Sequence, residues 1–118
     1  MIRRNFPPNK NKLDLPGGFV NNGETIKEAA IRETKEETGL NVELIAELTP
    51  VDYFDRQEKT SYSFVGKVAG GKVRASKEGK PVWIRIDKIK PQDLSFPTQF
   101  LPILKYYKAY KKKHYLLK

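Results

Sequence analysis

Apolar and polar positions between residues 26 and 38 repeat with the period of an amphipathic α-helix. At about 100° per residue, two carboxylates, Glu33 and Glu37, continue the stripe that the apolar side chains begin, and Glu36 lies at its edge. The apolar members are Ile26, Ala29 and Ala30, whereas the opposite side has the composition of a solvated face, with Lys27, Glu28, Lys35 and Thr38. Acids therefore stand where core-facing side chains are expected. Because crowded carboxylates repel one another, we expect a cationic group beside them.

Capping residues mark both ends of this helix. Thr25 and Glu28 have the three-residue spacing of a capping box. Gly39 follows the last periodic residue and suits the left-handed conformation that ends many helices. The sequence therefore predicts a helix over 26–38.

Further strands and a second helix are predicted along the rest of the chain. A short extended segment is expected at 13–15, and alternating side chains predict strands over 42–48, 60–68 and 82–86. In the last of these, the apolar side comprises Val82, Ile84 and Ile86. A final helix is expected to begin near Pro102 and to pack through Ile103, Leu104, Tyr107 and Tyr110. This order predicts one α+β domain over 1–118, with a mixed or antiparallel sheet.

Composition and charge narrow the class of protein. Of 118 residues, 38% are hydrophobic and 31% charged, which is typical of a folded domain rather than a disordered chain. The formal net charge of +9 favours polyanionic partners, although the lysines at 111–113 are interpreted as a solvated helix end. With no cysteine, disulfides, thiolate nucleophiles and cysteine-based metal sites are excluded. No apolar run approaches the roughly 18 residues of a membrane span, so a cytoplasmic location is the default expectation.

Glycine, arginine and acidic residues follow a fixed spacing from Gly18 onward. Glu24 follows Gly18 after five residues, and seven more residues precede the run Arg32-Glu33-Thr34-Lys35-Glu36-Glu37-Thr38-Gly39-Leu40. This pattern resembles the Nudix box, G-x5-E-x7-R-E-U-x-E-E-x-G-U, in which U is aliphatic. Every charged and glycine position matches, and Thr34 stands at an aliphatic position. The preceding LDLPGGFV also resembles the segment that leads into the box.

The resemblance implies a Nudix fold, in which a mixed β-sheet is flanked by helices in an α/β/α sandwich. It also implies magnesium-dependent cleavage of a pyrophosphate bond in a nucleoside diphosphate derivative, by attack of water on phosphorus. In the family pattern Glu33, Glu36 and Glu37 bind magnesium or manganese, and the backbone carbonyl of Gly18 commonly joins them. Magnesium prefers such oxygen ligands, and cations neutralise the phosphates that otherwise repel the attacking water.

Two further residues of the pattern have roles around these ligands. By the resemblance, Arg32 orients the carboxylates, and its position four residues before Glu36 permits an ion pair. Glu24 resembles the acid that stabilises the loop of the box. An alternative role for Glu24 is to accept hydrogen bonds from amides at the helix N-terminus near Thr25.

The sequence leaves the proton acceptor for the attacking water open. Glu36 and Glu37 are two candidates. The stretch KEGKPVW at 77–83 resembles a segment of MutT-type enzymes whose Glu lies close to the metals, which makes Glu78 our candidate. The alternative interpretation of Glu78 is an exposed loop acid, and Glu58 is a weaker candidate for the base.

Four residues are predicted to contact substrate: Arg3, Phe54, Gln99 and Phe100. Gln99 could bond a nucleobase and Phe100 could stack on one, since SFPTQFLPIL resembles the region where MutT-type enzymes carry a base-reading Asn. That Asn is absent here. Phe54 is a stacking candidate with Tyr53 and Tyr62, and each of these aromatic residues, Phe100 included, has a place in the core as its alternative.

The first residues, MIRRNFPPNKNKLDLPGG, resemble the end of the second strand of Nudix domains and the loop into the box. Nudix domains normally begin with an earlier hairpin strand. Because a missing strand exposes a sheet edge, we expect that the start is truncated or misassigned, or that a partner subunit, such as the second copy of a homodimer, completes the sheet.

Three functions are weighed. A MutT-like (deoxy)nucleoside triphosphate pyrophosphohydrolase is placed ahead of an ADP-ribose or dinucleotide pyrophosphatase, and product analysis would distinguish them. A non-catalytic Nudix-like module that binds nucleotides or RNA is the alternative from another class. Three mutually repelling glutamates and the lack of an RNA-binding aromatic motif argue against it. A nucleotide is therefore the expected partner, rather than nucleic acid or a membrane.

Overall fold

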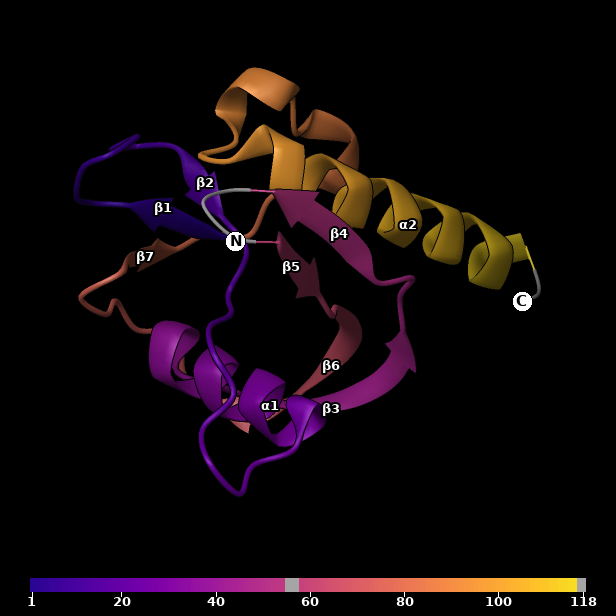
Figure 1. Cartoon of the computed structure of the whole chain (residues 1–118), viewed down its shortest axis with the longest axis horizontal. Coiled ribbons are helices and arrows are strands. Elements are labelled where there is room, and N and C mark those ends of the chain that lie inside the picture. The colour runs from indigo at the N-terminus through magenta and orange to yellow at the C-terminus, as the bar shows by residue number, and fades with distance from the viewer. Residues whose placement is uncertain (55–57, 117–118) are drawn as a thin grey trace.

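The computed structural model describes residues 1–54 and 58–116, and the side chains of residues 53, 54, 58, 115 and 116 lie outside that description. Within these described residues, two helices and seven strands follow in the order β1 (Ile2–Arg4), β2 (Leu13–Asp14), α1 (Ile26–Thr38), β3 (Leu40–Glu47), β4 (Val51–Phe54), β5 (Glu58–Ser61), β6 (Phe64–Gly71), β7 (Gly79–Pro81) and α2 (Pro97–Leu116). Two short 3₁₀ turns, η1 (Ile86–Lys88) and η2 (Pro91–Asp93), precede α2. Figure 1 shows α1 and α2 on opposite sides of the strands. The α+β prediction is confirmed.

The first sheet has the strand order β2-β1-β7, with antiparallel pairing throughout. Ile2 pairs with Asp14, and Arg3 pairs with Leu13. Because neighbouring strand residues point to opposite sides, Ile2, Arg4 and Asp14 share one side of the sheet, and Arg3 shares the other with Leu13. Ile2 is only 1% exposed, so this short sheet is anchored in the interior.

The remaining strands form two antiparallel pairs, β3 with β6 and β4 with β5. The single strand expected over 60–68 is therefore wrong. The chain changes partner at Tyr62 and Ser63, because β5 pairs with β4 whereas β6 pairs with β3. The carbonyl of Ser63 accepts from the Leu48 amide at this point.

Helix α1 has the predicted ends. The Thr25 hydroxyl accepts from the Glu28 amide, the Glu28 carboxylate accepts from the Thr25 amide, and Gly39 ends the helix at φ +82°. Thr38 departs from the expected solvated face, since it is buried at 6% exposure. Its hydroxyl donates to the Thr34 carbonyl and accepts from the Leu40 amide, which satisfies its polar group at the helix-to-strand junction.

Helix α2 closes the main core. It begins at Pro97, not near Pro102, and its amides at Gln99 and Phe100 bond the Phe96 carbonyl. The predicted packing residues are confirmed: Ile103 and Leu104 are buried in the core, and Tyr107 and Tyr110 pack against it. In the described part of the chain, neither helix is long and apolar enough to cross a membrane.

The strand expected over 82–86 is also wrong, because β7 ends at Pro81 and a 3₁₀ turn begins at Ile86. The alternation of this segment is nevertheless correct. Val82, Ile84 and Ile86 pack against the core, whereas the Trp83 side chain is 78% exposed. The side chains of this segment alternate between two faces as they would in a strand. Among the described residues, however, no neighbouring strand pairs along the segment.

Candidate active site

Arg32 of α1 is the cationic group at the centre of the acidic stripe. Its Nη1 donates to Glu33 at 2.8 Å and to Glu36 at 3.2 Å, so the expected four-residue ion pair with Glu36 is confirmed. Its Nε and Nη2 donate to the two oxygens of Glu24 at 2.7 Å and 3.0 Å, and Nη2 also donates to the Phe19 carbonyl at 3.0 Å. These bonds raise the pKa of the Arg32 guanidinium above its ordinary value, chiefly through Glu24 and then Glu33. The arginine is therefore a fixed positive charge among acids.

Glu24 fixes the loop that leads into α1. Besides the two bonds from Arg32, its carboxylate accepts from the Asn21 amide at 3.0 Å. The bonds from Arg32 and then from Asn21 hold the pKa of Glu24 below its ordinary value. Since Glu28 caps the Thr25 amide, Glu24 contributes to the loop rather than to the helix N-terminus.

Gly18 lies directly against the Glu33 carboxylate. A Cβ built at Gly18 would stand 2.5 Å from Glu33 Oε1, far inside contact distance. The loop backbone can therefore approach this acid only because residue 18 has no side chain. The two residues that the Nudix resemblance implies as ligands, Gly18 and Glu33, are therefore adjacent in space.

Glu37 is the most perturbed acid of the site. Its Oε2 accepts from the Gly17 amide at 2.7 Å, which favours the ionised form. Burial outweighs that bond and, with the negative charges of Glu33, Glu78 and Asp14, raises the pKa of Glu37 to about 7. Three acids, Glu33 of α1 and two from other segments, thus act on the charge of Glu37.

Two of those acids come from outside α1. Glu78 precedes β7, and the Ser76 hydroxyl accepts from its amide at 3.1 Å, which fixes the turn. Asp14 ends β2 and was not predicted as a site residue. It pairs with Arg4 at 3.1 Å, and the Ser95 hydroxyl donates to it. The apolar Leu13 beside it, in a segment expected to be extended, was a usable signal, because alternation turns Asp14 to the other side of the sheet.

The residues of this site fit a hard divalent cation by their chemistry. Carboxylates and a backbone carbonyl are the oxygen donors that magnesium prefers, and Gly18 lies next to the Glu33 carboxylate. As the side chains stand, no three acids among the described residues converge on one ion position. Arg32 bonds both Glu33 and Glu36.

The predicted substrate contacts are spread over the molecule. Arg3 lies on the side of β1 opposite Arg4 and donates to the Asn11 carbonyl at 2.9 Å. Phe100 is 7% exposed and belongs to the core, which favours its packing role over base stacking, while Gln99 is half-buried beside it. Tyr62 is 48% exposed. The side chains of Phe54, Tyr53 and Glu58 lie outside the described residues.

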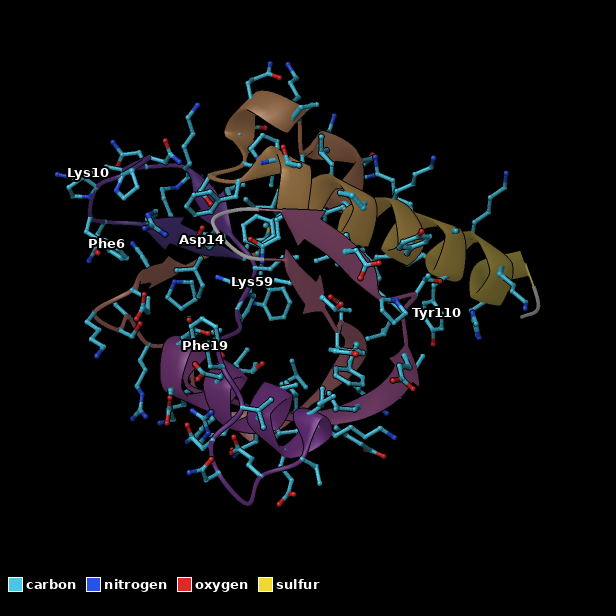
Figure 2. All side chains as sticks on the ribbon, in the orientation of Figure 1. Phe6, Lys10, Asp14, Phe19, Lys59 and Tyr110 are labelled. Atoms are coloured by element: carbon cyan, nitrogen blue, oxygen red, sulfur yellow. The ribbon has the colours of Figure 1, made fainter. Side chains whose placement is uncertain are left out.

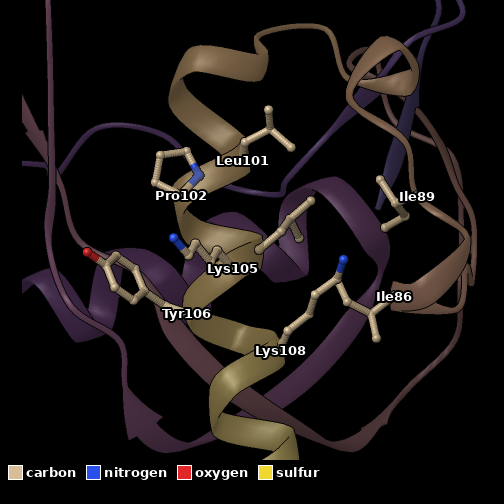
Figure 3. Close-up of a pocket in the computed structure, with 8 residues that line it drawn as sticks. Ile86, Ile89, Leu101, Pro102, Lys105, Tyr106 and Lys108 are labelled. Atoms are coloured by element: carbon tan, nitrogen blue, oxygen red, sulfur yellow. The ribbon is translucent and has the colours of Figure 1, made fainter.

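Two hollows lie apart from the acidic cluster. The larger, of about 480 Å³, runs between η1 and α2 and has apolar walls with Lys105 and Lys108 at its rim (Figure 3). The smaller, of about 350 Å³, is lined by Arg3 with Lys12, Leu13 and Ile84 among others. Neither hollow contains an acid of the α1 cluster.

The family model of the NUDIX domain matches residues 1–104. The chain belongs to the Nudix family. This Nudix chain is 40% identical over 83 residues to a protein named ADP-ribose pyrophosphatase from Methanocaldococcus jannaschii, a match that covers 68% of the chain and 49% of that protein. It is 42% identical over 62 residues to a putative 8-oxo-dGTP diphosphatase from Bacillus subtilis, covering 52% of the chain and 41% of that protein.

The fold of this Nudix domain also matches solved structures. The crystal structure of a MutT protein from Methanosarcina mazei Go1 superposes with a TM-score of 0.71 at 27% identity, covering 96% of the chain and 82% of that structure. The expected Nudix fold is thus confirmed. The matches span about half or less of the curated relatives above.

Proposed function

We propose that this Nudix domain hydrolyses a pyrophosphate bond in a nucleoside diphosphate derivative and depends on a divalent cation, magnesium or manganese. Water attacks one phosphorus atom, the bridging P–O bond breaks, and the products are a nucleoside monophosphate or equivalent and a second phosphate species. The observation that carries the proposal is the arrangement around Arg32, which gathers Glu24, Glu33 and Glu36 while the Gly18 backbone lies against Glu33.

In this proposal Glu33, Glu36 and Glu37, with the Gly18 carbonyl, hold the cation. When bound, it supplies neutralisation of phosphate charge and a lowered pKa for the attacking water. Arg32 positions the carboxylates, and Glu24 holds the loop in place through Arg32. These protein groups set the orientation of the pyrophosphate before reaction.

Glu78 is the proton acceptor that we propose for the attacking water. Its charge acts on Glu37, so it lies within electrostatic reach of the ligands. Among the described residues no cation pairs with it, in contrast to Glu24, Glu33 and Glu36, which all bond Arg32. A carboxylate left unpaired beside the ligands is suited to take a proton.

Two substrate classes are candidates. A (deoxy)nucleoside triphosphate is favoured by the similarity, at 27% identity over nearly the whole chain, to the MutT protein of known structure. ADP-ribose is favoured by the 40% identity to a protein with the name ADP-ribose pyrophosphatase. Both carry the pyrophosphate that the acidic site would address.

The test is product release from a panel of deoxynucleoside triphosphates, 8-oxo-dGTP, ADP-ribose and NADH with magnesium. Wild type is compared with Glu36→Gln, and with Glu43→Gln on the exposed side of β3 as a matched control. Turnover of one substrate by wild type and Glu43→Gln, but not by Glu36→Gln, supports the proposal and identifies the substrate class. No turnover of any compound by folded wild type with either metal contradicts it.

A further inference from the structure

Phe19 is held in place by its backbone while its ring faces solvent. It follows Gly18, which packs against the Glu33 carboxylate, and its carbonyl accepts from Arg32 Nη2 at 3.0 Å. Its side chain is nevertheless 79% exposed, the largest exposure among the large hydrophobic residues of the described chain. The site thus presents an aromatic face on a segment that its own acid–arginine cluster immobilises.

Lys59 reaches this ring from another element. It lies on β5, opposite Tyr53 of β4, and its side chain is half-buried. Its Nζ stands 5.7 Å from the centroid of the Phe19 ring, within the range of a cation–π contact. Figure 2 labels both side chains, Phe19 from the loop before α1 and Lys59 from β5.

Lys59 differs from the other cations near the acids in its hydrogen bonding. Arg32 bonds three carboxylates and a carbonyl, and Arg4 bonds Asp14 and the Pro8 carbonyl. Among the described residues, no acceptor takes a hydrogen bond from Lys59 Nζ. A polyanionic ligand carries more negative charge than a cation bound by the carboxylates would neutralise. A free ammonium beside the site is suited to bind the remaining phosphate charge.

We propose that Phe19 and Lys59 form a substrate clamp, in which the Phe19 ring stacks on the nucleobase and the Lys59 ammonium binds a phosphate of the same nucleotide. The inference rests on the proposed function and adds the residues that select a nucleotide over other pyrophosphates. Aromatic stacking accepts any base because every base has a π-face, so the clamp recognises nucleotides as a class.

The test compares a substrate that has a base with one that lacks it. Steady-state KM and kcat are measured with dGTP and with inorganic tripolyphosphate for wild type, Phe19→Ala, Phe19→Trp, Lys59→Met and Lys59→Arg. Val20→Ala, in the same exposed loop, is the matched control for Phe19. Lys67→Met, exposed on β6, is the control for Lys59.

Phe19→Ala is expected to raise KM for dGTP about tenfold and to leave KM for tripolyphosphate unchanged. Phe19→Trp, which keeps an aromatic ring, is expected to have wild-type KM values. Lys59→Met is expected to raise KM for both compounds, whereas Lys59→Arg, which keeps the positive charge, is expected to have wild-type KM values. Equal effects of Phe19→Ala on both compounds, or no effect on either, would overturn the proposal, because the ring would then be only a support for the loop.

Equilibrium binding separates this inference from the proposed function. Titration calorimetry with a non-hydrolysable α,β-methylene analogue of dATP needs no turnover. If wild type hydrolyses nothing yet binds the analogue, and Phe19→Ala weakens that binding about tenfold, the clamp is supported while the hydrolase proposal fails. Analogue affinity that is the same in wild type, Phe19→Ala and Lys59→Met overturns the clamp whatever the activity.

Discussion

Arg32 and Glu24 form a two-point ion pair across the loop of the Nudix box, with Nε–Oε2 at 2.7 Å and Nη2–Oε1 at 3.0 Å. The same Nη2 donates to the Phe19 carbonyl, so one guanidinium ties the loop to α1. Paired parallel bonds of this kind fix orientation as well as distance. We expect the position of Gly18 beside Glu33 to depend on this restraint.

Glu24→Gln is therefore expected to lower kcat/KM about a hundredfold, because a small displacement of the loop misplaces the ligands. The fold, followed by circular dichroism, should be retained. Lys27→Met, at an exposed position of α1, is the control and should keep wild-type kinetics. Activity of Glu24→Gln within twofold of wild type would mean that the loop needs no restraint from Glu24.

We expect Glu37 to make the stability of the metal-free protein depend on pH. Its pKa is raised from an ordinary 4.5 to about 7 in the folded chain by burial and then by neighbouring acids. Between these values the folded state binds more protons than the unfolded state, so the free energy of unfolding falls as pH rises. Glu37→Gln removes this penalty. In EDTA, its Tm should exceed that of wild type at pH 8, and the difference should vanish near pH 4.

Urea unfolding of both proteins across that pH range checks this prediction. A difference in stability that is constant with pH would show that the substitution acts by packing rather than by removing a charge.

Glu78→Gln is expected to lower kcat by a factor of about 10² to 10⁴ with little change in KM, the range for loss of a general base. The amide preserves the shape of the side chain, and the backbone bond to Ser76 is unaffected. Lys77→Met, exposed next to it, is the matched control. Unchanged kcat in Glu78→Gln would return the role of base to Glu36 or Glu37.

Magnesium should raise the Tm of wild type, because a ligand that binds only the folded state stabilises it in proportion to the logarithm of its concentration over Kd. Glu33→Gln should abolish most of this rise, since it removes the carboxylate next to Gly18. Calcium and sodium chloride at matched ionic strength provide the comparison. An equal rise in wild type and Glu33→Gln would place the binding elsewhere.

Gly39→Ala should destabilise the protein by more than about 2 kcal/mol, because its backbone is left-handed and an added Cβ has no space. The φ angle is +82°, and the Cβ would stand 2.1 Å from the Lys72 carbonyl oxygen. Gly17→Ala is the matched control, since nothing lies within 4 Å of its Cβ position. Denaturant midpoints that are equal for the two variants would contradict the structural reason.

The sequence by itself determined the Nudix helix, its ends and its family. The caps at Thr25 and Gly39, and the four-residue step from Arg32 to Glu36, are local relations that the geometry of a helix fixes. The spacing from Gly18 to Leu40 was sufficient to indicate the family before any fold was known. The alternation of apolar and polar residues also predicted correctly which side chains of 82–86 face the core, because neighbouring residues of an extended segment point to opposite sides.

Only the tertiary structure decided which distant segments meet. The sequence over 60–68 predicts one strand, but the structure divides this segment, because β5 pairs with β4 whereas β6 pairs with β3. Asp14 and Glu78 reach Glu37 only because β2, β1 and β7 form one sheet beside α1. Phe19, in the loop before α1, meets Lys59 of β5. Such contacts depend on the packing of the whole chain, which no local period or propensity encodes.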